Sequence, residues 1–420
     1  MLAETPRRKD GPLMLRRILA YADKMFQLTA AWKQVGDART QPVIPISAIT
    51  AAIFILFLNR FPSLNHLDQY RRQGAWRYYL GRRIPSGDEI AWASESIDPD
   101  SLRDILAHSY TRLMRNKVLQ PWFGWRVAAI DGHEINASYK RCCDHCLQRE
   151  LEVQGEKRIQ YYHRIVVLQL IGPRSRLLLD AEMQRPGEDE IGAALRLIER
   201  VLRRFPRAFD LLTGDGLYAR APVLKLLAIH DKYALMVLKD ERRDLLVDAR
   251  ALFARQSPAT HIEQTTRYDQ WDLEGFTSWD TVPFPVRVIR SLETTTARQH
   301  VNGQMIEVTT VRDWICVSTL PRSLLPTSNA VIFGHARWQI ENYAFNELST
   351  AWHADHYFHH HSVSIIAFWL LMFIAHTVFH TFCDRNLKPA FRNRYSMLFI
   401  AELLRSAFVF GDWDRTIPSQ

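Results

Sequence analysis

Apolar residues recur three and four positions apart through the first 120 residues, which is the spacing of amphipathic helices. The pattern is regular in LRRILAYADKMFQLTAAWKQV, from Leu15 to Val35. The stretch ISAITAAIFILFLNRF, from residue 46, is almost wholly apolar and predicts a buried helix. Ser86, with Glu89 three residues later, predicts a capped helix start. We therefore expect an all-helical N-terminal region.

From Arg126 the pattern changes to short apolar runs separated by turn residues, which is typical of strands. One longer segment has apolar positions at a spacing of 3.6 and predicts an amphipathic helix. The predicted order is strands at 126–131, 164–172 and 176–183, a helix at 191–205, a strand at 209–218, a helix at 221–230 and a strand at 233–240. Such an alternation predicts an α/β fold.

Residues 245–330 alternate between apolar and polar positions, as in FPVRVIRSL and MIEVTTVRDWICVSTL. These two runs flank Asn302-Gly303, a strong signal for a hairpin turn. We expect an antiparallel β block here, inserted between the α/β segment and a helix over 335–352.

The apolar stretch after Asp355 raises the question of a membrane span. It contains 28 residues without a charged side chain before Asp384, enough to cross a hydrocarbon layer of about 30 Å. His376 and His380 interrupt it, and a helix buried on all sides of a large domain has the same composition. We expect a buried core helix and no contact with a membrane.

The composition is that of a globular protein, because 47% of the 420 residues are apolar and 24% are charged. The formal net charge of +9 is unevenly distributed. Residues 1–125 carry 18 basic and 11 acidic side chains, whereas 126–383 are neutral overall. A basic N-terminal third favours an anionic partner such as nucleic acid.

Five cysteines in 420 residues do not make a disulfide framework. The N-terminal sequence MLAETPRRKDGPL has charges with no apolar run after them, so no signal peptide is expected. Both observations favour a reducing, cytoplasmic setting.

Three acids fall where the predicted elements end or meet. Asp131 ends the first strand, Asp215 follows the fourth strand between two glycines, and Glu341 lies on the helix after the β block. Carboxylates at strand ends form sites at one edge of an open sheet. Mg²⁺ prefers such oxygen ligands, and a pair of these ions suits in-line phosphoryl transfer. The alternative is that these acids are solvated caps and a solvated helix face.

The runs AIDGHEI, LLTGDGLYARAPV and RWQIENYAFNEL resemble the three signature blocks of DDE transposases encoded by bacterial insertion sequences. The resemblance covers about 126–383. It implies an RNase H-like mixed-sheet core interrupted by a β insertion. It also implies that Asp131, Asp215 and Glu341 form the catalytic triad and bind Mg²⁺, for which Mn²⁺ can substitute.

The resemblance further implies a DNA transposase that hydrolyses phosphodiesters at element ends and transfers the strand to target DNA. Its partners would be double-stranded terminal repeats and target DNA, bound by a homodimer in the bacterial cytoplasm and nucleoid. A catalytically silent DNA-binding relic and a metal-dependent nuclease without strand transfer are the alternatives. The expected organisation is a basic helical DNA-binding region (1–125), a first core segment (126–244), a β insertion (245–330), closing core helices (331–383) and a basic tail (384–420).

The chain departs from the wider family signature at two positions. A tyrosine three residues before Arg337 and a lysine seven after Glu341 are replaced by Gly334 and Leu348. DNA-contact roles tied to those side chains therefore cannot be transferred.

Other side chains remain as DNA-contact hypotheses, each with a structural alternative. Arg337 is expected to bind a phosphate or to pair with Glu341, four residues on. Trp338 would stack on a base or pack in the core, and Tyr218 would contact phosphate or pack. A basic cluster near Trp76, Tyr78 and Tyr79 is either a DNA patch or a solvated surface; it consists of Arg71, Arg72, Arg77, Arg82 and Arg83.

Cys143 and Cys146 have half of the spacing of a zinc site. A second pair of ligands is needed, for which His133 and His163 are candidates. The alternative is a pair of unmetallated thiols in a surface loop. Five histidines between 353 and 361 also suggest a metal, with a helix boundary near DNA as the plainer interpretation.

Overall fold

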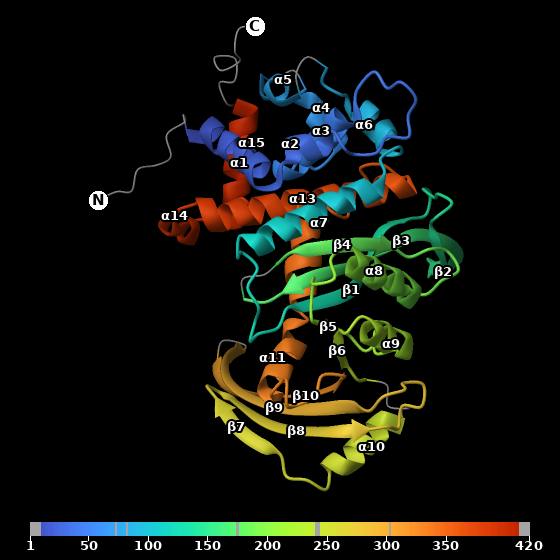
Figure 1. The fold of residues 1–420 in the computed structure, drawn as a ribbon, viewed down its shortest axis with the longest axis vertical. Helices are drawn as coiled ribbons and strands as arrows, with labels where there is room; N and C mark the ends of the chain where they lie inside the picture. Colours follow the sequence, from blue (N-terminus) through green and yellow to red (C-terminus); the bar gives the residue numbers. More distant parts are fainter. Residues whose placement is uncertain are drawn as a thin grey trace.

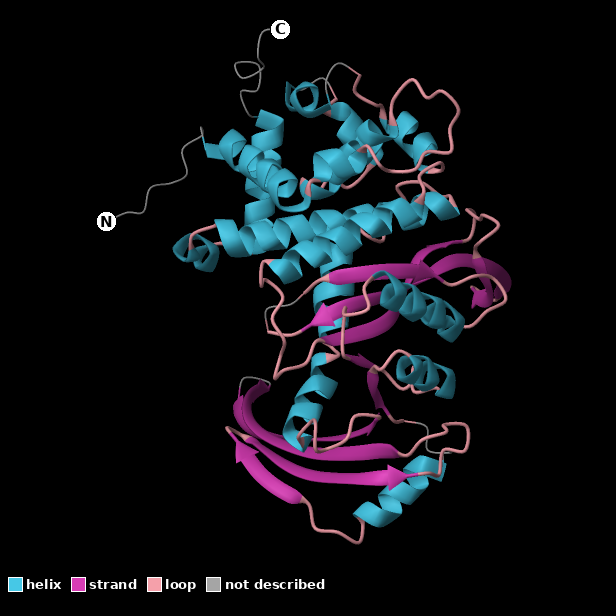
Figure 2. Cartoon of the chain, viewed as in Figure 1, coloured by secondary structure: helices cyan, strands magenta, loops and turns pink. Residues whose placement is uncertain are grey.

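The computed structural model describes residues 10–410, except 72–73, 81–82, 174–175, 240–243 and 302–303. Helices gather at one end of the molecule, and curved antiparallel strands form the other (Figures 1 and 2). The N-terminal helices are α1 (Asp10–Phe26), α2 (Leu28–Trp32), α3 (Ile46–Leu58), α4 (Leu64–Gln69), α5 (Gly74–Leu80), α6 (Gly87–Ser94) and α7 (Pro99–Arg115).

Two of these helices begin at side-chain caps, and the first of the two was predicted from the sequence. Ser86 accepts a hydrogen bond from the Glu89 N–H while the Glu89 carboxylate accepts from the Ser86 N–H, which confirms the capping box of α6. Asp98 caps α7 by accepting from the N–H groups of Asp100 and Ser101. These capping bonds satisfy N–H groups that have no partner inside the helix.

One mixed sheet of ten strands runs through the rest of the described chain, in the order β2-β3-β1-β5-β6-β10-β9-β8-β7, with β4 also paired to β3. The pairs β1–β5 and β5–β6 are parallel, and the others are antiparallel. The strands are β1 (Val127–Ser138), β2 (Leu147–Val153), β3 (Glu156–Ile171), β4 (Leu178–Met183), β5 (Leu211–Gly214), β6 (Tyr233–Val237), β7 (Ala259–Glu263), β8 (Thr266–Phe276), β9 (Val286–Val301) and β10 (Gln304–Ser318).

The antiparallel strands continue the main sheet, because β10 pairs with β6. The predicted hairpin is present, with Val301 opposite Gln304, while its turn residues Asn302 and Gly303 lie outside the described residues. The predicted succession of strands and helices along the chain, from Arg126 to residue 240, is confirmed. Strand β2 was not predicted. Its polar positions and mostly solvent-facing pattern make it an extension of the sheet beyond the core, which leaves a weak sequence signal.

Helices cover both faces of the sheet. Helices α8 (Glu190–Arg204) and α9 (Ala221–Ile229) pack on one face, against β3, β4 and β6. On the other face lies a segment predicted as one helix over 335–352 (Figure 1). In the structure it is α11 (Thr327–Ala336), a π-helical turn η1 (Ile340–Phe345) and α12 (Asn346–Trp352). Single π-helical turns occur often at functional sites.

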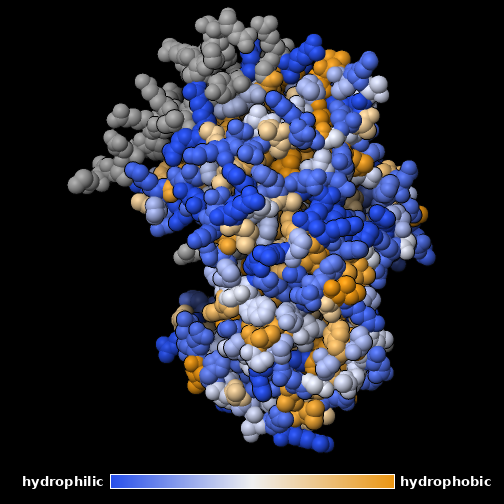
Figure 3. All heavy atoms as spheres, in the orientation of Figure 1, coloured by the Kyte–Doolittle hydropathy of each residue, from blue (hydrophilic) through white to orange (hydrophobic). Residues whose placement is uncertain are grey.

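Helix α13 (Ser362–Asn386) is long and apolar enough to cross a membrane, yet 89% of its most apolar window is buried inside the protein. It packs against α3, α7 and β4, between the N-terminal helices and the sheet. On the face shown in Figure 3, apolar residues are scattered among polar ones. The buried-core interpretation of this stretch therefore agrees with the structure.

The segment expected as a basic C-terminal tail contains two helices within its described part, up to residue 410. It forms α14 (Pro389–Arg394) and α15 (Met397–Phe410), and α15 packs against α1. Leu404 and Phe408 are fully buried there. Helix α10 (Asp244–Phe253) precedes β7 and packs against β8.

Candidate functional site

The strand register brings Asp131 and Asp215 together. Residues 127–129 of β1 pair in parallel with 211–213 of β5, with a constant offset along the chain. The same offset, carried two residues further, sets Asp131 opposite Asp215. Neighbouring strands lie about 4.8 Å apart, and paired residues project from the same face of the sheet. The two residues therefore lie near each other at the end of β5, where the charge of Asp215 acts on Asp131.

The prediction that Asp131 ends its strand was wrong, because β1 continues to Ser138 along β3. Only the parallel partner β5 stops at Gly214. The site therefore lies beside a continuous strand, where β5 gives way to a turn. Within that turn the Leu217 N–H donates to Oδ1 of Asp215 at 2.8 Å, which orients the carboxylate.

Asp131 faces the π-helical turn. A Cβ added to Gly132 would lie 2.4 Å from Oε1 of Glu190 at the start of α8, so Gly132 faces the α8 side. Side chains alternate along a strand, and Asp131 and His133 consequently face the opposite side. The His133 ring stacks on Phe345 of η1, with ring centroids 4.8 Å apart.

Glu341 lies in η1, the turn that contacts β1 and β3. The Arg337 guanidinium donates to Oε1 of Glu341 at 3.0 Å, and Arg337 is only 3% exposed. Of the two roles predicted for Arg337, the structure contains the ion pair. This pair fixes the Glu341 side chain and brings one positive charge to the acidic site.

Electrostatic coupling links the three acids. Burial raises the pKa of Asp131 to about 7, the Gly132 N–H opposes that rise, and the negative charge of Asp215 adds to it. Arg337 lowers the same pKa, and Glu341 raises it. Asp131 thus feels two neighbouring negative charges and the single positive charge of Arg337, an arrangement whose repulsion a bound cation would relieve. The oxygen donors fit a hard divalent cation.

Tyr218 does not have the exposure of a DNA contact. It is fully buried, and its hydroxyl donates to Oε1 of Glu190 at 2.5 Å. Burial and the Glu190 carboxylate raise the pKa of Tyr218 well above its usual range. Of the two predicted roles the packing role fits, because a phosphate cannot reach a hydroxyl enclosed by the core.

Glu190 is the residue that sequence reasoning missed. It is 8% exposed, accepts from Tyr218 and forms an ion pair with Arg164 at 3.0 Å. Its carboxylate lies against the β1 backbone at Gly132, on the face opposite Asp131. In the sequence it is merely an acid in the first turn of a predicted helix, where acids are common. The glycine in the Asp-Gly motif leaves room for this carboxylate.

We expect Gly132→Ala to destabilise the protein by about 1–3 kcal/mol, as overpacked sites do. The new methyl group would overlap the Glu190 carboxylate, which Tyr218 and Arg164 hold in place. Thermal denaturation of the variant measures the effect.

Gly216→Ala is the matched control for this prediction. Its added Cβ would meet Lys239 Cβ at 3.4 Å, an ordinary contact. Equal melting temperatures for the two variants would contradict the close approach of Glu190 to β1.

The remaining predicted DNA contacts have mixed surroundings. Trp338 is 41% exposed, so core packing does not account for it, and the Arg337 guanidinium lies 4.7 Å from its ring centroid. Trp76 is fully buried against Phe408, with ring centroids 5.0 Å apart, and so does not belong to an exposed aromatic patch.

The basic cluster is partly engaged within the protein. The Arg71 guanidinium donates to the Ile84 carbonyl at 3.1 Å and lies 3.8 Å from Glu89. Arg83 donates to the Val43 carbonyl at 3.0 Å. Arg72 and Arg82 lie outside the described residues.

Cys143 and Cys146 are close to His163, as one of the hypotheses required, and to His360. Nε2 of His133, the other proposed ligand, instead lies 3.2 Å from Oδ1 of Asp355. The histidines between 353 and 361 do not share a helical face, because that segment is not helical.

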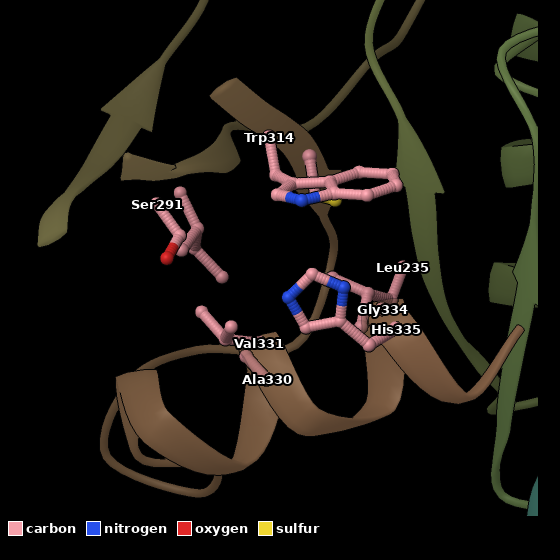
Figure 4. A pocket seen from close by; sticks show the side chains of 9 residues that line it. Leu235, Ser291, Trp314, Ala330, Val331, Gly334 and His335 are labelled. Carbon is pink, nitrogen blue, oxygen red and sulfur yellow. The ribbon is translucent and has the colours of Figure 1, made fainter. Parts of the chain in front are cut away.

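A small apolar cavity lies between α11 and strands β9 and β10 (Figure 4). Trp314 and His335 line it and contact each other edge to face, with ring centroids 4.9 Å apart, and Nε2 of His335 lies 2.6 Å from Oε1 of Glu293. None of the three carboxylates lines this cavity. It is therefore separate from the acidic site.

Comparison with known families bears on the acidic site. A family model described as the transposase DDE domain matches residues 122–378, more than half of the chain. The match spans Asp131, Asp215 and Glu341. No curated protein matches the sequence.

Proposed function

Because the chain belongs to the transposase DDE domain family, we propose that it cuts DNA at element ends and joins the freed strand to target DNA. The observation that carries the proposal is the convergence of three carboxylates from distant parts of the chain. The β1–β5 register brings Asp215 near Asp131, and the charges of Asp215 and of Glu341 in η1 both act on Asp131. Carboxylate clusters of this kind bind divalent cations for phosphoryl transfer.

Asp131, Asp215 and Glu341 would hold Mg²⁺, with Mn²⁺ able to replace it. Bound divalent ions would activate the attacking oxygen and stabilise the charge on the leaving oxygen. The protein contributes the arrangement of the ligands. The Leu217 N–H orients Asp215, and Arg337 orients Glu341. These contacts reduce the reorganisation needed when substrate binds.

The sheet supports an RNase H-like core. Its order β4-β3-β1-β5-β6 combines three antiparallel strands with two parallel ones, and the β-strand insertion follows β6. We keep the expected division of the chain as a proposal. Its parts are a DNA-binding region (1–125), core segments (126–244 and 331–383), an insertion (245–330) and a C-terminal segment (384–420).

The test uses the purified protein with Mg²⁺ and DNA that contains both sequences flanking its coding region. We expect nicking that leaves a 3′-hydroxyl at the element end, followed by joining to a labelled target duplex. Binding without nicking would favour the silent relic. Nicking without joining would favour a nuclease.

DNA binding is expected to weaken steeply with salt, because the N-terminal region would bind mainly phosphates. With 6–10 phosphate contacts, affinity should fall about 10³–10⁵-fold between 50 and 200 mM salt. Replacing Arg71, Arg77 and Arg83 by Ala should weaken this salt dependence. The slope of log affinity against log salt concentration should decrease by about one unit for each lost phosphate contact. Fluorescence anisotropy across a salt series measures it.

Arg203→Ala on α8 is the control, since that exposed side chain lies outside the basic cluster. An unchanged slope in the triple variant would place the DNA surface elsewhere.

The expected homodimer is tested by the mass of the DNA-bound complex, since two element ends must be held together.

A further inference from the structure

Four metal-binding side chains from separate segments meet beside the sheet. Cys143 and Cys146 lie in the loop between β1 and β2, His163 lies in β3, and His360 precedes α13. Cys146 is 5% exposed and His163 is fully buried. One potential ligand atom from each residue lies within 4.8 Å of the other three.

The distances among these atoms match a tetrahedral zinc site. Zinc binds sulfur at about 2.3 Å and nitrogen at about 2.0–2.1 Å. Tetrahedral angles then separate two sulfurs by about 3.8 Å, sulfur from nitrogen by about 3.6 Å, and two nitrogens by about 3.3 Å. In the structure the two Sγ atoms are 3.7 Å apart, and the Nε2 atoms of His163 and His360 are 3.4 Å apart. Three of the four sulfur–nitrogen distances are 3.5 Å for Cys143–His163 and 3.3 Å for both Cys146–His163 and Cys146–His360; the fourth is within 4.8 Å.

Two other interpretations account for less of this geometry. A disulfide requires sulfurs about 2.05 Å apart, far closer than the 3.7 Å found. Hydrogen bonds between thiols and imidazoles explain individual sulfur–nitrogen contacts, but a thiol has a single proton and cannot bridge several neighbours at once. Five close contacts among four potential ligand atoms are the arrangement that a shared cation imposes. The Cys143 N–H also donates to the Cys146 sulfur at 3.2 Å, as suits a thiolate ligand.

We propose that Cys143, Cys146, His163 and His360 bind one zinc ion. Two thiolates and two imidazoles complete a tetrahedral site and leave no open position, which is the mark of a structural zinc. The ion would be separate from the divalent cations of the acidic site, whose ligands are all oxygens.

The zinc would connect the segment 353–361, which follows η1 and α12, to the core sheet. His163 pairs with Ile135, four residues after Asp131 on β1. His360 lies in the segment that follows α12 and the Glu341 turn, and Asp355 of that segment contacts His133. Zinc at this point fixes the segment 353–361 against β1 and β3, and so restricts the position of η1.

The first test is the zinc content of the purified protein, measured by elemental analysis. We expect one zinc per chain. We expect Cys146→Ser and His360→Gln each to lower the content at least 10-fold, since removing one ligand leaves an incomplete site. Cys142→Ser and His361→Gln are the matched controls. They change neighbouring residues outside the quartet and should retain zinc.

A second measurement needs no variant. A mercurial added to the native protein should release one zinc ion, detected by a chromogenic chelator, as the two ligand thiols react. If the protein is purified without zinc, Co²⁺ added under reducing conditions should give the visible bands of a tetrahedral thiolate complex. Absence of zinc together with absence of these bands would overturn the proposal. So would full zinc content in both Cys146→Ser and His360→Gln.

Failure of this proposal is distinguishable from failure of the proposed function. Zinc content is measured without DNA and without Mg²⁺, so it does not depend on catalysis. Asp131→Asn should retain the full zinc content, because Asp131 is not among the four ligands. A loss of zinc in that variant would contradict the separation of the two sites.

Discussion

Asp131→Asn, Asp215→Asn and Glu341→Gln will each lower the rate of DNA cleavage by at least about 10³-fold, equivalent to about 4 kcal/mol of lost transition-state stabilisation. Alanine at the same positions will abolish cleavage. The amide variants keep the size of each side chain and remove the charge that a divalent cation needs. The measurement is single-turnover cleavage of end-containing DNA at saturating Mg²⁺.

DNA binding by the three variants should stay within a few-fold of the wild type, because the proposed binding surface lies in the N-terminal region. This separates loss of chemistry from loss of fold. Equal losses of binding and cleavage would point to misfolding, which thermal denaturation would reveal.

Glu347→Gln tests whether the right acid of the helical segment has been assigned. In the structure the Glu347 carboxylate lies 2.7 Å from His380 and accepts from the Trp352 ring N–H at 3.2 Å. Burial raises the pKa of Glu347, but hydrogen bonds and charge interactions with His376 and His380 outweigh burial and lower it, so the carboxylate remains ionised. If Glu341→Gln cleaved DNA normally and Glu347→Gln did not, Glu347 and not Glu341 would be the third metal-binding carboxylate.

The element order was readable from sequence because each element carries a strong local pattern. The β9–β10 hairpin, the capping box of α6 and the strand–helix alternation after Arg126 depend on residues a few positions apart. The fully apolar α13 also had a clear sequence signal. Deciding that it is buried inside the protein required knowledge of its neighbours, α3, α7 and β4.

The parts of the site that escaped prediction depend on contacts between distant segments. Glu190 contacts Gly132 across more than fifty residues, and no periodicity in either segment indicates this. His360 joins Cys146 from 214 residues away. The π-helical turn at Glu341 also lacks a local signal, because its residues suit an ordinary helix.

Burial of Asp131, to which the neighbouring acids add, has a consequence for stability. In the folded protein the pKa of Asp131 is about 7, whereas the usual value is 3.8. Between these two pH values the folded state keeps a proton that the unfolded state has lost. Stability therefore falls as pH rises from about 4 to about 7, and the loss is complete above pH 7. At about 1.4 kcal/mol per pH unit the full effect is on the order of 4 kcal/mol.

Asp131→Asn should therefore be more stable than the wild type at pH 8 without metal, by roughly 2–4 kcal/mol once partial solvent access to the site is allowed for. At pH 4 the two proteins should unfold at nearly the same temperature. Thermal denaturation between pH 4 and 8.5 measures the difference. Glu199→Gln, which removes an exposed acid of α8, is the control and should show no such divergence.

Mg²⁺ should reverse this order of stability. The cation binds the ionised carboxylates of the folded wild type and stabilises it by mass action, while the Asn variant lacks one ligand. Because protons compete with the metal, the apparent affinity for Mg²⁺ should fall about tenfold for each pH unit below 7. Two results together would show that the acids do not form a cation site. In the first, the wild type is more stable than Asp131→Asn at pH 8 without metal. In the second, Mg²⁺ does not stabilise the wild type.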